Sequence, residues 1–156
     1  MITDQEAKEI MYQEGRRQAL DLQGRAADMT GTEVIAEEGK VPLFVPDKDY
    51  SGWDVGSPVA EIVDGEAQVF KWITPVNTAH YPGMRPSTSP ALLSPCHTTD
   101  PAKDKPYLPP NGTSGLYMTD EVCTKGGHLW RSTKDDNPYP PGEVGTDGYW
   151  EDLGEM

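Results

Sequence analysis

Several side chains with aromatic or imidazole rings lie in loops rich in proline and glycine, where a regular sheet cannot easily bury them. They are His80, Tyr81, Tyr139 and Tyr149. Sugars present flat C–H faces rimmed by hydroxyl groups, so their binding sites combine exposed rings with a few fixed polar groups. Because loops often carry binding residues, these four residues indicate recognition of an uncharged, partly apolar ligand such as a carbohydrate.

Two tryptophans lie at the ends of expected strands, where a ring can either pack in a core or contact a ligand. Aromatic residues inside expected strands are interpreted as core residues; they are Phe70, Trp72, Tyr117 and Trp130. The candidate carbohydrate-binding residues are therefore His80, Tyr81, Tyr139, Tyr149, Trp150 and Trp53.

Catalytic signatures are missing from the sequence. Glycoside hydrolysis needs two carboxylates about 5 to 10 Å apart across a cleft, and no acid lies in an apolar segment that would raise its pKa. The histidines, His80, His97 and His128, have neither i, i+4 spacing nor an H-E-x-x-H motif. Cys96 and Cys123 lack metal-ligand spacing, which favours free thiols over a disulfide or a zinc site. We expect no enzyme activity, no cofactor and no metal.

The charge of the chain limits its partners. Its 156 residues carry a net charge of −13, which repels nucleic acid and anionic membranes. The N-terminus lacks the basic start and apolar run of a secretory signal, and no segment has the length of apolar sequence that spans a bilayer. The stretch 134–156 holds seven acids against one lysine; a solvated face is one interpretation and a calcium site the other.

The first 48 residues are expected to precede the main β structure. Thr3 and Glu6 form a T-x-x-E capping box, which predicts a helix from Asp4 to Leu20. Its narrow apolar stripe would pack either on its own domain or on copies of itself. We assign 1–28 to this helix and 29–48 to a β arm, in which Glu33–Ala36 and Val41–Val45 form a hairpin or a connecting arm.

The rest of the chain repeats itself over about 45 residues. Gly52–Val59 resembles Gly115–Val122, and each is followed by a glycine turn, an aromatic strand and a Tyr-Pro loop before a closing strand. In this alignment Trp130 matches the Phe70-Lys71-Trp72 strand, whereas Trp150 is matched by Leu92. The prediction is a mainly β fold, with an N-terminal α-helix before two small three-stranded antiparallel modules at 49–99 and 105–155.

At the level of whole motifs, the strings DYSGW, VNTAHYPG, HTTDPAK, PNGTSGLYM and GGHLWRS are similar to small bacteriophage tail and fibre proteins. These proteins contain tandem modules of the chitin- and cellulose-binding type. The resemblance covers about Val41 to Leu153, while an N-terminal helix belongs only to the phage version. In the first module, Leu92 takes the place of the closing tryptophan. This difference leaves open whether the first module still binds a ligand.

The resemblance implies a virion component, assembled in the bacterial cytoplasm, in the tail, fibre or baseplate. Its implied partners are cell-surface or cell-wall polysaccharide, other virion tail proteins and copies of itself. A homo-oligomer is expected, with a trimer as one form and the oligomeric state left open. The alternative is a purely structural adaptor, whose aromatic rings would be buried against a neighbouring virion protein instead of a sugar.

Overall fold

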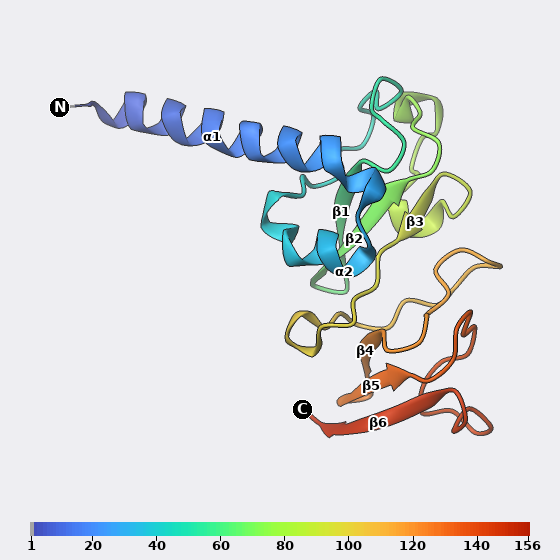
Figure 1. Cartoon of the computed structure of the whole chain (residues 1–156). Helices are drawn as coiled ribbons and strands as arrows, with labels where there is room; N and C mark the ends of the chain where they lie inside the picture. Colours follow the sequence, from blue (N-terminus) through green and yellow to red (C-terminus); the bar gives the residue numbers. More distant parts are fainter. Residues whose placement is uncertain (1) are drawn as a thin grey trace.

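The computed structural model describes residues 2–156, and its first element is a long helix, α1 (Asp4–Arg25). The predicted start is confirmed, since the Thr3 hydroxyl accepts a hydrogen bond from the Glu6 N–H at 3.1 Å. The helix runs five residues beyond the predicted end at Leu20. Only its last turns touch the rest of the molecule, where Leu22 is fully buried, so most of α1 projects as a single rod (Figure 1).

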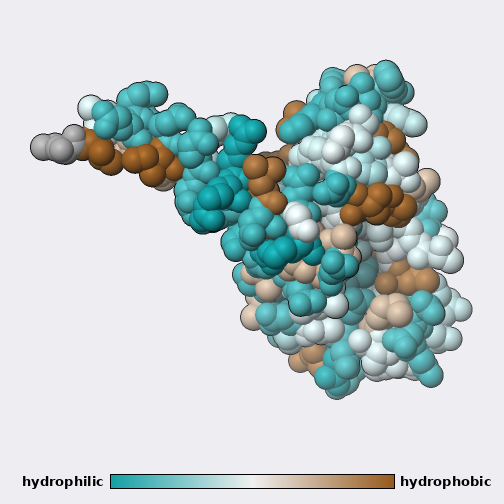
Figure 2. All heavy atoms as spheres, turned by 45° about the horizontal axis from the view of Figure 1, so that its top comes forward, coloured by the Kyte–Doolittle hydropathy of each residue, from teal (hydrophilic) through white to brown (hydrophobic). Residues whose placement is uncertain are grey.

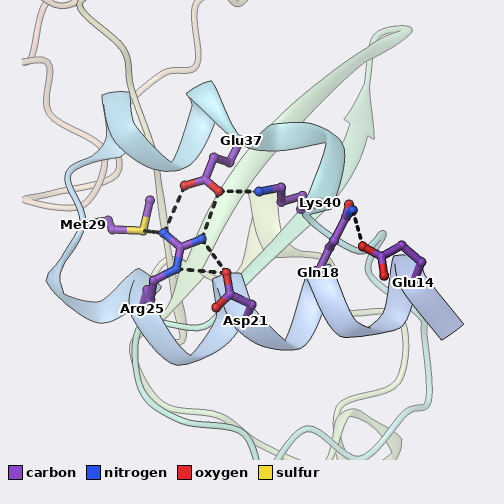
Figure 3. Close-up of polar contacts among 7 residues, drawn as sticks. All are labelled: Glu14, Gln18, Asp21, Arg25, Met29, Glu37 and Lys40. Carbon is purple, nitrogen blue, oxygen red and sulfur yellow. Dashed lines mark hydrogen bonds and ion pairs between the residues drawn. The ribbon is translucent and has the colours of Figure 1, made fainter.

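The end of α1 is fixed by polar contacts as well as by burial. Arg25 donates hydrogen bonds to Asp21 one turn earlier and to Glu37 on the segment that follows α2. Lys40 also bonds the Glu37 carboxylate, at 2.8 Å. Figure 3 shows the Arg25 guanidinium between the two acids. Hydrogen bonds from Arg25 and Lys40 lower the pKa of Glu37 to about 2, so the carboxylate stays charged and holds the direction of α1.

The strand predicted at Glu33–Ala36 is wrong, because Gly31–Ala36 forms a short helix, α2. Thr30 and Glu33 make a complete capping box, which supplies partners for the free N–H groups of the first turn. Val34 and Ile35 are buried. Packing on the first sheet therefore outweighs the β propensity of this segment.

Gly31 permits the close docking of α2. A Cβ atom added there would lie only 2.4 Å from the backbone oxygen of His97. The second predicted strand of the arm, Val41–Val45, is extended at Leu43, which forms a parallel bridge with Ala60. The arm is thus a helix followed by an extended segment rather than a hairpin.

Two three-stranded antiparallel sheets follow, which confirms the predicted fold class. The first contains β1 (Pro58–Val63), β2 (Glu66–Trp72) and β3 (Leu93–Pro95), in that order. The second contains β4 (Val122–Lys125), β5 (His128–Ser132) and β6 (Trp150–Glu155). Each opening hairpin has a two-residue turn, Asp64-Gly65 or Gly126-Gly127, in which both residues have positive φ, as a type I′ turn requires.

Each sheet has its own small core, and the two modules lie against each other (Figure 1). The first core contains Tyr50, Val59, Phe70, Trp72 and Leu93; the second contains Tyr117, Cys123 and Trp150. Backbone bonds also join the modules, since the Val122 N–H donates to Thr98 O at 2.8 Å. Within residues 2–156, no helix combines the length and the apolar character that crossing a bilayer requires.

The two modules repeat the same hydrogen bonds, which shows how they correspond. In both, the last residue of the second strand exchanges backbone bonds with the two residues just before the first strand. In the first module, Trp72 accepts from the Gly56 N–H and donates to the Ser57 carbonyl. In the second module, Ser132 accepts from the Asp120 N–H and donates to the Glu121 carbonyl. Phe70 of the first module therefore corresponds to Trp130 of the second, within the strand that the sequence alignment predicted. The predicted match of Gly52–Val59 with Gly115–Val122 is off by one residue, because Val59 corresponds to Cys123 and not to Val122.

In the closing strands, the structural correspondence between the two modules is shifted by one residue from the predicted alignment. Leu93 pairs with Trp72, and Trp150 pairs with Ser132 at the equivalent place. Leu93 therefore occupies the position of Trp150, and the expected match with Leu92 is wrong. Leu92 corresponds instead to Tyr149, because the two carbonyls accept equivalent bonds from Ile73 and Thr133.

Candidate functional site

The second module displays two tyrosines as a pair. The rings of Tyr139 and Tyr149 pack edge to face, with centroids 4.7 Å apart. Tyr139 is 45% exposed, and Tyr149 is partly buried. Tyr139 lies in the middle of the long loop between β5 and β6, and Tyr149 lies at its end, so folding brings together two candidate residues that are ten apart in sequence.

A fully buried asparagine positions the two tyrosines. The Asn137 Oδ1 atom accepts a hydrogen bond from the Tyr139 N–H at 3.1 Å, and its Nδ2 group donates to the Tyr149 carbonyl at 2.9 Å. The same Nδ2 group also donates to the Ser132 hydroxyl. A buried amide with hydrogen-bond partners on both atoms strongly favours one arrangement. Asn137 therefore fixes the backbone at Tyr139 and at Tyr149. Sequence reasoning did not identify this residue as part of the site, although its place two residues before Tyr139 is typical of an Asx turn.

Trp150 lies beneath the pair rather than beside it. It is only 4% exposed, and its Nε1–H donates to the Tyr139 carbonyl at 2.7 Å. Its ring packs edge to face on Tyr117, with centroids 5.2 Å apart. Trp150 thus joins the exposed tyrosines to the core of the module.

The loop that follows Tyr139 is attached to the opening hairpin. Lys125 donates to the Pro141 carbonyl at 3.2 Å and bonds Glu143 at 2.8 Å. Trp130 is half-buried and donates its Nε1–H to the Lys125 carbonyl. A Cβ atom added to Gly142 would lie 3.2 Å from the Trp130 ring, so the loop packs directly on this tryptophan.

The other candidate residues lie in the first module and do not join this pair. Tyr81 and His80 are exposed in the loop after β2. Trp53 packs edge to face on Tyr50, with ring centroids 4.7 Å apart. The first module also lacks an equivalent of the pair, because Ala79 and Leu92 occupy the places of Tyr139 and Tyr149.

The acidic side chains near the second module serve its structure. Hydrogen bonds from Lys125 lower the pKa of Glu143, and a hydrogen bond from His128 lowers that of Asp152. Burial raises the pKa of Glu121, whose carboxylate accepts a hydrogen bond from the Met118 N–H at 2.6 Å. Among residues 2–156, no three His, Cys, Asp or Glu side chains are grouped so as to hold a metal ion.

The two cysteines are free, as predicted, and both are buried. Comparison with known proteins adds no assignment: no family model matches the chain, and no curated protein matches it.

Proposed function

We propose that the second module binds carbohydrate through Tyr139 and Tyr149. The observation that carries this proposal is an exposed edge-to-face tyrosine pair whose loops are fixed by the buried Asn137. A ring that is held in place before binding loses little conformational freedom when a ligand packs on it. Each tyrosine also offers a hydroxyl group to a sugar, and no charge is needed for this contact.

The proposed setting is a phage virion, in which the module would contact cell-surface or cell-wall polysaccharide of the host. This setting is supported by the sequence resemblance to tail and fibre proteins. The first module, with Ala79 and Leu92 in the equivalent places, would mainly serve as a packing unit.

The test measures retention of the full-length protein on chitin, cellulose and purified bacterial cell wall. The wild-type chain should bind at least one of them, and the Tyr139→Ala/Tyr149→Ala variant should bind about 30-fold more weakly, since two rings contribute roughly 2 kcal/mol together. Tyr81→Ala is the matched control, because it removes an equally exposed tyrosine from the first module. Equal binding by the double variant and the wild type would refute the proposal, as would no retention of the wild type on any of these polymers.

A structural adaptor is the second candidate function, and the projecting helix favours it. Most side chains of α1 are exposed, and its N-terminal part projects away from the two modules (Figure 1), which suits attachment to another protein. In that role the tyrosine pair would lie beneath a protein partner. Mapping by hydrogen exchange within an intact particle would then show protection at Tyr139 and Tyr149 without any saccharide present.

A further inference from the structure

An open groove of about 560 Å³ lies between α1 and the segment that leads into β1. We call it the helix groove. Its lining combines apolar side chains, among them Leu20, Leu43, Val45 and Trp53, with the two cations Arg16 and Lys48. Leu20, Leu43 and Val45 are all exposed, so the groove presents apolar surface that the rest of the described chain does not cover.

The charge of the groove is opposite to that of the molecule. The chain has 26 acidic residues, yet none of them lines the groove, whereas Arg16 and Lys48 both do. Within residues 2–156 neither cation forms an ion pair. The Lys48 ammonium instead lies 5.2 Å from the centre of the Trp53 ring. The groove is therefore suited to a ligand that is both apolar and negatively charged.

The N-terminal half of α1 has both of these properties. Residues 4–14 contain four acids and one lysine, whereas residues 15–25 contain three arginines and one acid. Arg17 and Arg25 pair with acids of their own chain, so Arg16 is the arginine that faces a partner in the groove. In the N-terminal half, the exposed fraction of Ile10 is 58% and that of Met11 is 73%. Figure 2 shows the hydrophobic side chains along the projecting part of the helix.

We propose that two copies of this chain pair their α1 helices antiparallel, each placing the N-terminal half of its helix in the helix groove of the other. An antiparallel pair sets each acidic half beside a basic half, which a parallel pair would not do. It also forms a closed two-fold interface, the commonest symmetry among soluble oligomers. This pairing does not depend on carbohydrate binding, and it differs from the trimer expected from the phage resemblance.

The lengths of the two partners match. The groove follows α1 from Tyr12 to Gln23, a distance of about 16 Å at 1.5 Å per residue. The segment from Asp4 to Glu14 spans about 15 Å by the same rise. The bonds between Arg25 and Glu37 and the buried Leu22 attach the end of α1 to the body, so the groove and the projecting half are both formed within a single copy.

The experiment uses sedimentation equilibrium of the full-length chain with two charge-reversed variants. Arg16→Glu/Lys48→Glu reverses the groove, and Asp4→Lys/Glu9→Lys reverses the projecting half. We expect the wild type to be a dimer, and each variant alone to dissociate at least tenfold more readily, because like charges then meet. An equimolar mixture of the two variants should form a heterodimer. One of its two helix-in-groove contacts is then wild-type, and in the other both the groove and the projecting half have reversed charge, so opposite charges meet in both.

The matched control is Lys103→Glu/Lys134→Glu, which makes the same charge change at exposed sites away from the groove. It should dimerise like the wild type. Circular dichroism checks that each variant keeps its fold. A wild-type monomer or trimer, a dimer unaffected by either reversal, or variants that fail to pair when mixed would each overturn the proposal.

Discussion

Acidification should destabilise the fold through one buried histidine, His97. Its ring stacks on Tyr117 with centroids 3.7 Å apart, and its Nε2–H donates to the Gly115 carbonyl at 2.9 Å. Burial of the ring disfavours its charged form, and this desolvation lowers the pKa of His97 from 6.5 to about 4. The stability that the neutral ring contributes is therefore complete above about pH 6.5 and is lost as the pH falls towards 4.

The magnitude follows from proton linkage. With a pKa of 6.5 in the unfolded chain and about 4 in the fold, the free energy of unfolding falls by about 2 kcal/mol between neutral pH and about pH 5. The net effect of His97 should thus be about 2 kcal/mol.

The assay is urea unfolding of the wild type and of His97→Gln at several pH values. Glu121 acts in the opposite direction, because burial raises its pKa and its protonation favours the fold as the pH falls. The comparison with His97→Gln removes this shared contribution. His80→Gln is the control, since His80 is an exposed loop residue. If His97→Gln and the wild type lose stability in parallel between pH 7 and about pH 5, the proposed burial of a neutral His97 is wrong.

Two further predictions concern groups in the cores. Tyr117→Phe removes the hydroxyl that accepts the Leu108 N–H at 3.0 Å, and it should lower the free energy of unfolding by about 1 kcal/mol in urea titration; an unchanged midpoint would show that this bond does not matter. Burial raises the pKa of both Cys96 and Cys123 to about 12, so a thiol reagent at mildly alkaline pH should react with neither until urea unfolds the chain. Rapid labelling of the native protein would contradict this burial.

The β modules could be predicted because their signals are local. The dipeptides Asp64-Gly65 and Gly126-Gly127 specify tight turns, and each is flanked by apolar residues at strand spacing. The order of turns and aromatic residues then repeats, which predicts two modules without any long-range information. The alignment was off by one residue both at Gly52–Val59 and at Leu92, because these segments contain no turn of this kind to set their register.

The helix α2 was missed although its signal was present. Thr30 and Glu33 have the same T-x-x-E spacing that correctly predicted the start of α1. The β-branched Val34 and Ile35 suggested a strand instead. Their burial against the first sheet is a tertiary effect, and only the structure shows that it favours the helix.

Two of the six candidate residues, Tyr139 and Tyr149, lie together in the structure, an arrangement that the sequence does not predict. Tyr139 and Tyr149 were chosen because proline- and glycine-rich loops cannot bury them easily, whereas their contact depends on the hydrogen bonds of Asn137. Trp150 gave no sequence signal that separates a core ring from an exposed one. Its burial follows from where β6 joins β5, which is a long-range property.

The comparison of the two modules explains why a repeated fold need not carry a repeated function. Both modules share backbone bonds at the ends of their strands, and in both an asparagine side chain, Asn77 or Asn137, accepts a hydrogen bond from the N–H two residues on. These bonds fix the backbone at two loop positions, whichever side chains those positions carry. The second module has Tyr139 and Tyr149 at these places, whereas the first has Ala79 and Leu92. The proposed carbohydrate binding therefore concerns the second module alone, and we expect Tyr139→Ala/Tyr149→Ala in the full-length chain to leave no retention through the equivalent face of the first module.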